Sequence, residues 1–257
     1  MLKVALLHLA PRAGNILHNR LLIERGVRLA AAEGCNWAIT PELAVCGYTF
    51  APLIGTDWIE VQPDRWMSQM GRLAAKLCIY LFLSAPERDE ETNCLHNSVF
   101  VLGPSGHILG RHRKIKTLRV GSESWSSPGG DAQPIVLGNG RKVGAMICAD
   151  AYSPNIPQQL QRQGASILVS PAAWAPGPHG PKGEWERSTV DTGLPLFVCN
   201  RTGRDAVADF TPGESVVAHG GRRLASASSP RSAAFMFTLK TYYGTPAAEN
   251  FYSVDLE

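Results

Sequence analysis

The sequence predicts an α/β protein in which apolar strands alternate with helices in layers. Three observations lead to this prediction: short apolar runs recur along the chain, helical stripes of apolar residues lie between them, and no linker is long enough to divide the 257 residues. Chains of about 250 residues often form one domain of this class. We therefore expect residues 1–257 to form a single domain in which both faces of each sheet are covered.

In the first half of the chain, apolar runs bounded by glycine, proline or polar residues predict strands. The first helix is marked by Ile16, Ile23, Val27 and Ala30 on one face and by Gly34 as a stop. The predicted order is a strand at 2–9, a helix at 15–33, a strand at 36–40, a helix at 63–77, a strand at 78–85 that ends at Pro86, and a hairpin of strands at 97–103 and 108–114.

The second half continues the alternation and then changes to hairpins. The pattern predicts a strand at 142–148, a helix at 157–163, a strand at 166–170, a helix at 184–192 and a strand at 195–199, followed by hairpin-like strands at 214–219, 222–227 and 232–239. Residues 240–257 form a C-terminal tail. Its aromatic side chains suit an interface between copies of the chain, and we expect a homodimer or a larger homo-oligomer.

Composition excludes several kinds of partner. The net charge of +3 is too small to indicate a nucleic-acid partner. No apolar run approaches the ~18 residues of a membrane span, and the N-terminus has no signal segment. The six cysteines are scattered without C-x-x-C pairs, which argues against zinc and against a disulfide framework and predicts a reducing, cytoplasmic compartment.

Three chemically suited residues stand at the ends of predicted strands: Glu42, Lys114 and Cys148. Strand ends are where sites form in α/β sheets. A thiol with a pKa of about 8.5 is mostly protonated at neutral pH, so a nucleophilic cysteine needs a base, and Glu42 could accept the proton. Lys114 and a backbone amide would stabilise the resulting oxyanion by ~3 kcal/mol or more. Singly, each residue is more often structural or solvated, but together they suffice for acyl transfer through a thioester.

The segments around these residues resemble the nitrilase, or carbon–nitrogen hydrolase, superfamily, nearly from end to end. TPELAVCGY resembles the segment that carries the general base, which places it on Glu42. HNSVFVLGPSGHILGRHRKIK resembles the hairpin that ends in the family's lysine, which places it on Lys114 rather than Lys116. GAMICADAYSP resembles the nucleophile segment and places the nucleophile on Cys148.

This resemblance implies a four-layer αββα sandwich and a cysteine-dependent hydrolase that needs no cofactor or metal. A second glutamate, Glu123 in ESWSSPGG, is expected to orient Lys114 or to assist proton transfer to the leaving amine. The backbone amide of Ala149 is expected to help hold the oxyanion. The residues Cys148-Ala149-Asp150 resemble the amidase and carbamoylase branches, so a small amide or N-carbamoyl substrate is favoured over a nitrile.

Loops around the strand ends are expected to form the substrate pocket. Tyr48, Trp125 and Trp174 are candidate walls, with core or subunit packing as the open alternative. His179 and Glu184, in a segment rich in glycine and proline, could bind a polar group of the substrate, with a solvated loop as the open alternative for each of them. Relatives often carry an acid where this chain has Asn155, which predicts altered support near the site.

The same residues are compatible with other functions. The same thioester could be intercepted by an amine, which would make the protein an amide transferase, or an ammonia donor, that works with a separate partner. A non-enzymatic alternative is a catalytically inactive scaffold that keeps the fold. A metal-dependent phosphoesterase fits poorly because His8, His96 and His112 lack nearby aspartates, and no histidine stands in a motif typical of papain-like proteases.

Overall fold

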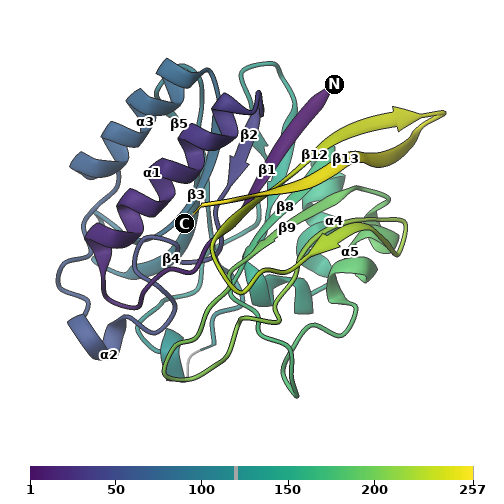
Figure 1. The fold of residues 1–257 in the computed structure, drawn as a ribbon. Helices are drawn as coiled ribbons and strands as arrows, with labels where there is room; N and C mark the ends of the chain where they lie inside the picture. The colour runs from purple at the N-terminus through teal and green to yellow at the C-terminus, as the bar shows by residue number, and fades with distance from the viewer. Residues whose placement is uncertain (119–120, 257) are drawn as a thin grey trace.

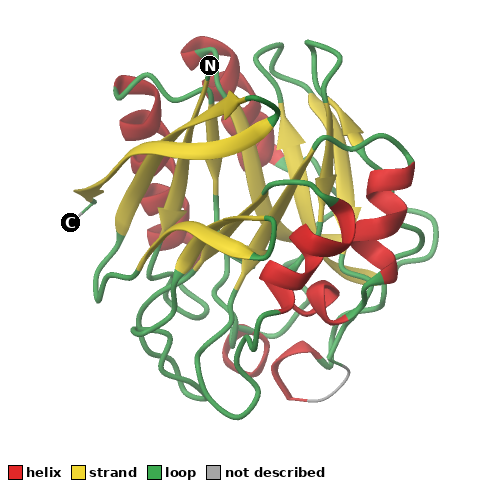
Figure 2. Cartoon of the chain, turned by 90° about the vertical axis from the view of Figure 1, so that its right-hand side faces the viewer, coloured by secondary structure: helices red, strands yellow, loops and turns green. Residues whose placement is uncertain are grey.

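The computed structural model, which describes residues 1–118 and 121–256, has two β-sheets packed face to face with helices on both outer sides (Figure 1). This arrangement confirms the predicted layered α/β class and the four-layer αββα sandwich. Turning the molecule shows the two helical layers on either side of the strands, with long loops gathered at one end (Figure 2). Within the described residues, no helix has the length and apolar character needed to cross a membrane.

The first sheet has seven strands in the order β13-β12-β1-β2-β3-β4-β5. Strands β1, β2 and β3 run parallel to their neighbours in this set, and the other pairs are antiparallel. Its strands are β1 (Leu2–His8), β2 (Trp37–Ile39), β3 (Tyr80–Arg88), β4 (Leu95–Leu102), β5 (Ile108–Arg113), β12 (Ala233–Tyr242) and β13 (Thr245–Asp255).

Helices α1 (Ile16–Ala32) and α3 (Arg65–Leu77) cover the outer face of this sheet, and the short α2 (Ala51–Ile54) lies in the loop between β2 and α3. Both long helices begin at a polar side chain that accepts a hydrogen bond from the first turn. Asn15 accepts from the amide of His18, and Asp64 accepts from the amide of Met67.

The second sheet has six strands in the order β11-β10-β9-β8-β7-β6. They are β6 (Ile135–Val136), β7 (Lys142–Ala145), β8 (Ile167–Ala172), β9 (Leu196–Asn200), β10 (Ser215–His219) and β11 (Arg222–Ala227). Helices α4 (Asn155–Arg162) and α5 (Glu184–Thr192) cover its outer face. Two 3₁₀ turns, η1 (Gly121–Glu123) and η2 (Cys148–Tyr152), complete the described elements.

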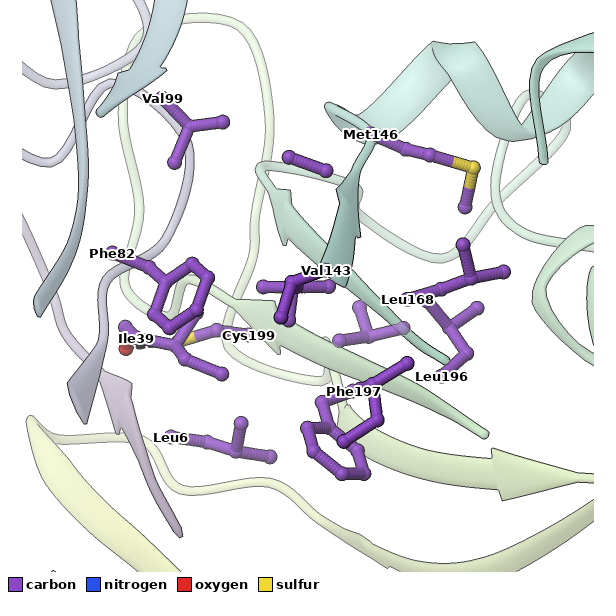
Figure 3. Packing of buried hydrophobic residues seen from close by; sticks show 14 of the residues in the cluster. Leu6, Ile39, Phe82, Val99, Val143, Met146, Leu168, Leu196, Phe197 and Cys199 are labelled. Carbon is purple, nitrogen blue, oxygen red and sulfur yellow. Dashed lines mark hydrogen bonds between the residues drawn. The ribbon is translucent and has the colours of Figure 1, made fainter. Parts of the chain in front are cut away.

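The main core lies between the two sheets, and Figure 3 shows part of it at close range. Leu6, Ile39 and Phe82 come from the first sheet, and Val143 and Phe197 come from the second. Because successive side chains of a strand point to opposite faces, the alternate residues face the helices instead. Ala5 and Leu7 of β1 accordingly pack in the second cluster, with the apolar faces of α1 and α3.

Most boundaries differ from the sequence-based expectation by one or two residues, and three differences are larger or change the role of a segment. Strand β3 continues past Pro86 to Arg88. Proline has no backbone N–H to donate, but β2 pairs with β3 only as far as Phe82, so no strand on that side needs a hydrogen bond from Pro86. The strand expected at 142–148 ends at Ala145. The expected C-terminal tail instead forms the end of β12 and all of β13, and its place at an interface between copies stays a prediction.

Replacing Gly71 by alanine tests the close approach of α3 to the turn between β4 and β5. Alanine usually stabilises a helix by about 1 kcal/mol relative to glycine. Here the added methyl group would overlap the carbonyl oxygen of Gly106, a main-chain atom that cannot swing away. We expect Gly71→Ala to lower the free energy of unfolding by about 1–3 kcal/mol, measured by denaturant titration.

The matched control is Gln69→Ala, on the exposed side of the same helix, which should change the free energy of unfolding by less than about 0.5 kcal/mol. A Gly71→Ala protein as stable as the wild type would contradict the tight contact between α3 and this turn.

Candidate active site

Glu42 lies just after β2 and is completely buried. Its Oε1 accepts hydrogen bonds from Lys114 Nζ at 2.7 Å and from Asn97 Nδ2 at 2.8 Å. Its Oε2 accepts from the backbone amide of Ala173, which follows β8 of the other sheet, at 3.0 Å. Each carboxylate oxygen therefore has a fixed donor, and the side chain is held in one orientation.

Lys114 follows β5 directly, and its backbone amide donates to the carbonyl of Asn97 at 2.8 Å. Its buried ammonium group donates to Glu42 at 2.7 Å and to both carboxylate oxygens of Glu123 at 2.8 and 2.7 Å. Burial acts to lower the pKa of Lys114, but the negative charge of Glu42 and the groups around it outweighs this effect and raises the pKa well above its ordinary value. Lys114 is therefore a permanent cation.

Asn97 links the two carboxylates that hold Lys114. Its Nδ2 donates to Oε1 of Glu42 and to Oε1 of Glu123, both at 2.8 Å. Asn97 is the first residue of the strand that the sequence predicts at 97–103. Nothing in the sequence pattern distinguishes it from an ordinary polar residue at a strand end, so the sequence does not predict its place in the site. Glu123 also accepts a hydrogen bond from the backbone amide of Leu118 at 3.3 Å. This bond helps to fix the carboxylate in the orientation in which it binds Lys114.

Cys148 opens the turn η2 and has a positive φ of 46°. A residue with a side chain rarely adopts this left-handed conformation, and such residues cluster at functional sites. Burial raises the pKa of the thiol well above its ordinary value, and the negative charge of Glu42 raises it further, while Lys114 and the backbone amide of Ala173 act in the opposite direction. The thiol therefore keeps its proton until a base removes it.

Glu42 is suited to be that base. Burial is the largest effect that raises the pKa of Glu42, and the charge of Glu123 adds to it, whereas Lys114 and a hydrogen bond with Cys148 lower it. The pKa stays above its ordinary value of 4.5, so the carboxylate binds a proton more strongly than a free glutamate does. A stronger base next to a thiol favours proton transfer between them.

Asp150 connects the Cys148 turn to the segment after Lys114. Its Oδ2 accepts from the backbone amide of Ile147 at 2.9 Å and bonds His112 Nε2 at 2.8 Å, while its Oδ1 accepts from the amides of Ile115 and Lys116 at 3.0 and 2.8 Å. Burial acts to raise the pKa of Asp150, but these donors outweigh burial and lower it. The ionised carboxylate thus ties the two segments together.

A cavity of about 680 Å³ opens beside Cys148. Four of the residues singled out from the sequence line it: Tyr48, Ala149, Trp174 and His179. Their roles in binding the substrate or the oxyanion stay predictions. The described lining also includes Leu118, Tyr152, Val207 and Phe210, which the sequence pattern did not single out.

Three residues singled out from the sequence lie elsewhere. Trp125, expected as a pocket wall, is not among the described lining residues and packs against Phe50 with ring centroids 5.1 Å apart. Glu184 is buried at the start of α5 and accepts from the backbone amide of Lys182. Asn155 is exposed at the start of α4, also outside this lining.

Within residues 1–118 and 121–256, no group of three or more histidine, cysteine, aspartate or glutamate side chains is arranged to hold a metal ion. The buried ammonium group of Lys114 instead lies between the carboxylates of Glu42 and Glu123. What the arrangement supplies is a thiol, a base beside it and a fixed cation.

Comparison with known proteins gives a consistent result. The family model of the carbon–nitrogen hydrolases matches residues 3–232. A probable nitrilase of Schizosaccharomyces pombe is 23% identical over 97% of this chain and 93% of its own length, and a citrullinase of Francisella tularensis is 28% identical over 88% and 84%. The solved structure of an amidase from Nesterenkonia sp. AN1 has a similar fold, with a TM-score of 0.80, 22% identity, and coverage of 93% of each chain.

Replacing Asp150 by alanine should show how much the link to the Cys148 turn stabilises the fold. Removing this buried acceptor leaves His112 and three backbone amides without their partner, so we expect the free energy of unfolding to fall by about 3–5 kcal/mol at neutral pH. Because the folded protein lowers the pKa of Asp150, its contribution is present above the ordinary value of 3.8 and is lost as the pH falls through the lowered value.

Chemical denaturation of both proteins between pH 7 and pH 3 measures this difference. Asp191→Ala, an exposed aspartate on α5, is the control and should change stability by less than about 0.5 kcal/mol. A gap between wild type and Asp150→Ala that widens as the pH falls would contradict the account.

Proposed function

Because the chain belongs to the carbon–nitrogen hydrolase family, we propose that it hydrolyses the carbon–nitrogen bond of a small amide or N-carbamoyl compound through a thioester on Cys148. The observation that carries this proposal is that Cys148 lines the cavity and also interacts with the Glu42 carboxylate and the Lys114 ammonium. A thiol, a base and a fixed cation meet at one point, and the acyl carbon of a substrate can reach that point from the cavity.

In the first half of the reaction, Glu42 takes the proton of Cys148 as the sulfur attacks the carbonyl carbon. The carbonyl π electrons move to oxygen, and the resulting oxyanion is held by the charge of Lys114 and the backbone amide of Ala149. A fixed donor of this kind typically accelerates acyl transfer by about 10²–10³-fold. The protonated Glu42 then gives its proton to the nitrogen, the carbon–nitrogen bond breaks, and ammonia or an amine leaves.

In the second half, water replaces the amine. Glu42 takes a proton from water, the oxygen attacks the thioester carbon, and the carbon–sulfur bond breaks as the tetrahedral intermediate collapses. The proton returns from Glu42 to the sulfur, so the enzyme regains its starting state and the acid is released. Glu123 contributes by holding Lys114 in place through two hydrogen bonds.

Two of the three similar proteins support an amide-type substrate, whereas the third is named a probable nitrilase. One is a citrullinase and one is an amidase, and both names describe the cleavage of a carbon–nitrogen bond. We place this chain's activity in the same broad class, with a small molecule as substrate, and we expect homo-oligomers of the chain to be the working form.

Replacing Cys148 by alanine should abolish the activity and leave the fold intact. Without the sulfur no thioester can form, so ammonia release from an amide should fall by at least about 10⁴-fold. The control is Cys199→Ala, which changes a cysteine that is also buried, lies in β9 and donates to two backbone carbonyls of the first sheet. That variant should keep most of its activity, and far-ultraviolet circular dichroism should be unchanged for both. Full activity in Cys148→Ala would refute the proposal.

The pH dependence of kcat/KM should report the ionisation of Glu42. Because Glu42 must be ionised to accept the thiol proton and its pKa is raised above 4.5, kcat/KM should increase with pH along a limb that lies above that value. The charge of Glu123 is one of the causes that raise the pKa of Glu42. Glu123→Gln should therefore move the limb to lower pH, even though the rate also falls as Lys114 loses a partner.

The matched control is Glu184→Gln, which removes a buried carboxylate outside the cavity lining and should leave the position of the limb unchanged. A limb that stays in place or moves to higher pH in Glu123→Gln would contradict the assigned electrostatics.

A further inference from the structure

Exposed apolar side chains gather at the mouth of the cavity beside Cys148. Leu118 is 46% exposed, Tyr152 is 46% exposed and Val207 is 62% exposed, and all three line this one cavity. A single exposed apolar side chain on a protein surface is ordinary and needs no explanation. Several around one hollow, next to a reactive sulfur, indicate a surface that a ligand covers.

Two aromatic pairs form further parts of the lining. The rings of Tyr48 and Phe210 meet edge to face with centroids 6.1 Å apart, and those of Tyr152 and Trp174 do so at 4.9 Å. The Tyr152 hydroxyl and Trp174 Nε1 both donate to the carbonyl of His179, at 3.1 and 2.6 Å. Because the protein itself satisfies these polar atoms, what this pair offers a substrate is mainly apolar ring surface.

No lysine or arginine of the described lining is available to pair with an anionic substrate. None of the described residues that line the cavity is an aspartate, glutamate, lysine or arginine. Arg201 is close by, with its guanidinium 4.3 Å from the centroid of the Phe210 ring, but it is buried, pairs with Asp205 at 3.1 Å and donates to the carbonyl of Pro11 at 3.2 Å. Each of its three guanidinium nitrogens already donates to an acceptor within the protein, and its charge is paired with Asp205.

The catalytic groups themselves disfavour an anion. Lys114 supplies one positive charge, and Glu42 and Glu123 supply two carboxylates around it. A substrate carboxylate would therefore lose its water in an apolar cavity, find no lysine or arginine in the described lining, and face an excess of negative charge.

From these contacts we infer that the site takes uncharged amides with a bulky apolar acyl group, aromatic or branched, and discriminates against amides that carry a carboxylate. This inference rests on the proposed hydrolysis and specifies its substrate. The acyl group lies against Val207, Phe210 and Trp174, with the carbonyl carbon at Cys148. The cavity volume of about 680 Å³ leaves room for a phenyl or branched alkyl group as well as the amide.

The discriminating experiment compares kcat/KM for acetamide, butanamide, hexanamide, phenylacetamide and succinamate by ammonia release, with the intact protein. Each methylene that enters the apolar cavity should raise kcat/KM by about fourfold until the cavity is filled. Phenylacetamide and hexanamide should therefore exceed acetamide by at least about 30-fold, and succinamate should fall below butanamide.

A flat response to chain length, or succinamate turned over as fast as hexanamide, overturns the inferred substrate class and leaves the hydrolysis standing. Absence of ammonia from every amide and from N-carbamoyl compounds overturns the proposed function, and the substrate class with it.

A pair of variants tests the placement of the acyl group. Val207→Lys puts a cation at the mouth of the cavity and should raise the ratio of kcat/KM for succinamate to that for hexanamide by about tenfold, because the new ion pair and the lost apolar contact act in the same direction. Val190→Lys adds the same charge at a valine of equal exposure, 63%, on α5 and outside the described lining, and should leave the ratio unchanged. Equal ratios in the two variants overturn the assignment of Val207 to the acyl site.

Discussion

The ammonium group of Lys114, enclosed between Glu42 and Glu123, is the interaction on which the site depends. All three side chains are removed from solvent, and taking a charge out of water costs several kcal/mol per ion unless close partners offset it. The amide of Asn97 and the backbone amides of Ala173 and Leu118 supply the remaining donors. Burial raises the pKa of both Glu42 and Cys148; the charge of Glu123 adds to this effect at Glu42, and the charge of Glu42 adds to it at Cys148. The raised values make Glu42 a better base and keep Cys148 protonated at rest.

The packing of the two sheets brings these groups together. Glu42, Asn97 and Lys114 belong to the seven-stranded sheet or follow its strands directly, whereas Cys148 and Ala173 follow strands of the six-stranded sheet. The apolar layer between the sheets, part of which Figure 3 shows, therefore sets the distance from base to nucleophile. Asp150 reinforces this placement, because its carboxylate binds backbone amides before Cys148 and after Lys114. The same placement directs the sulfur toward a cavity with an apolar lining, so catalysis and substrate choice share one geometric origin.

Much of this could be predicted from the sequence, because strand and helix periodicity is local and the segments around Glu42, Lys114 and Cys148 have a recognisable pattern. The parts that could not be predicted depend on contacts between distant segments. Nothing near Asn97 shows that its amide joins two carboxylates, and nothing near Trp125 shows that its ring faces Phe50 instead of the cavity. The left-handed backbone of Cys148 was missed for the same reason, since the apolar residues before it read as a strand that runs on to the cysteine.

The most direct test of the account is to look for the thioester itself. The protein is mixed with phenylacetamide or hexanamide, quenched in acid during steady-state turnover, digested and analysed by mass spectrometry. We predict that the peptide containing Cys148 gains the mass of the acyl group in place of one hydrogen, that the adduct disappears once the substrate is exhausted, and that peptides with the other cysteines stay unmodified. Amide turnover with an acyl adduct confined to a different residue would contradict the central role assigned to Cys148.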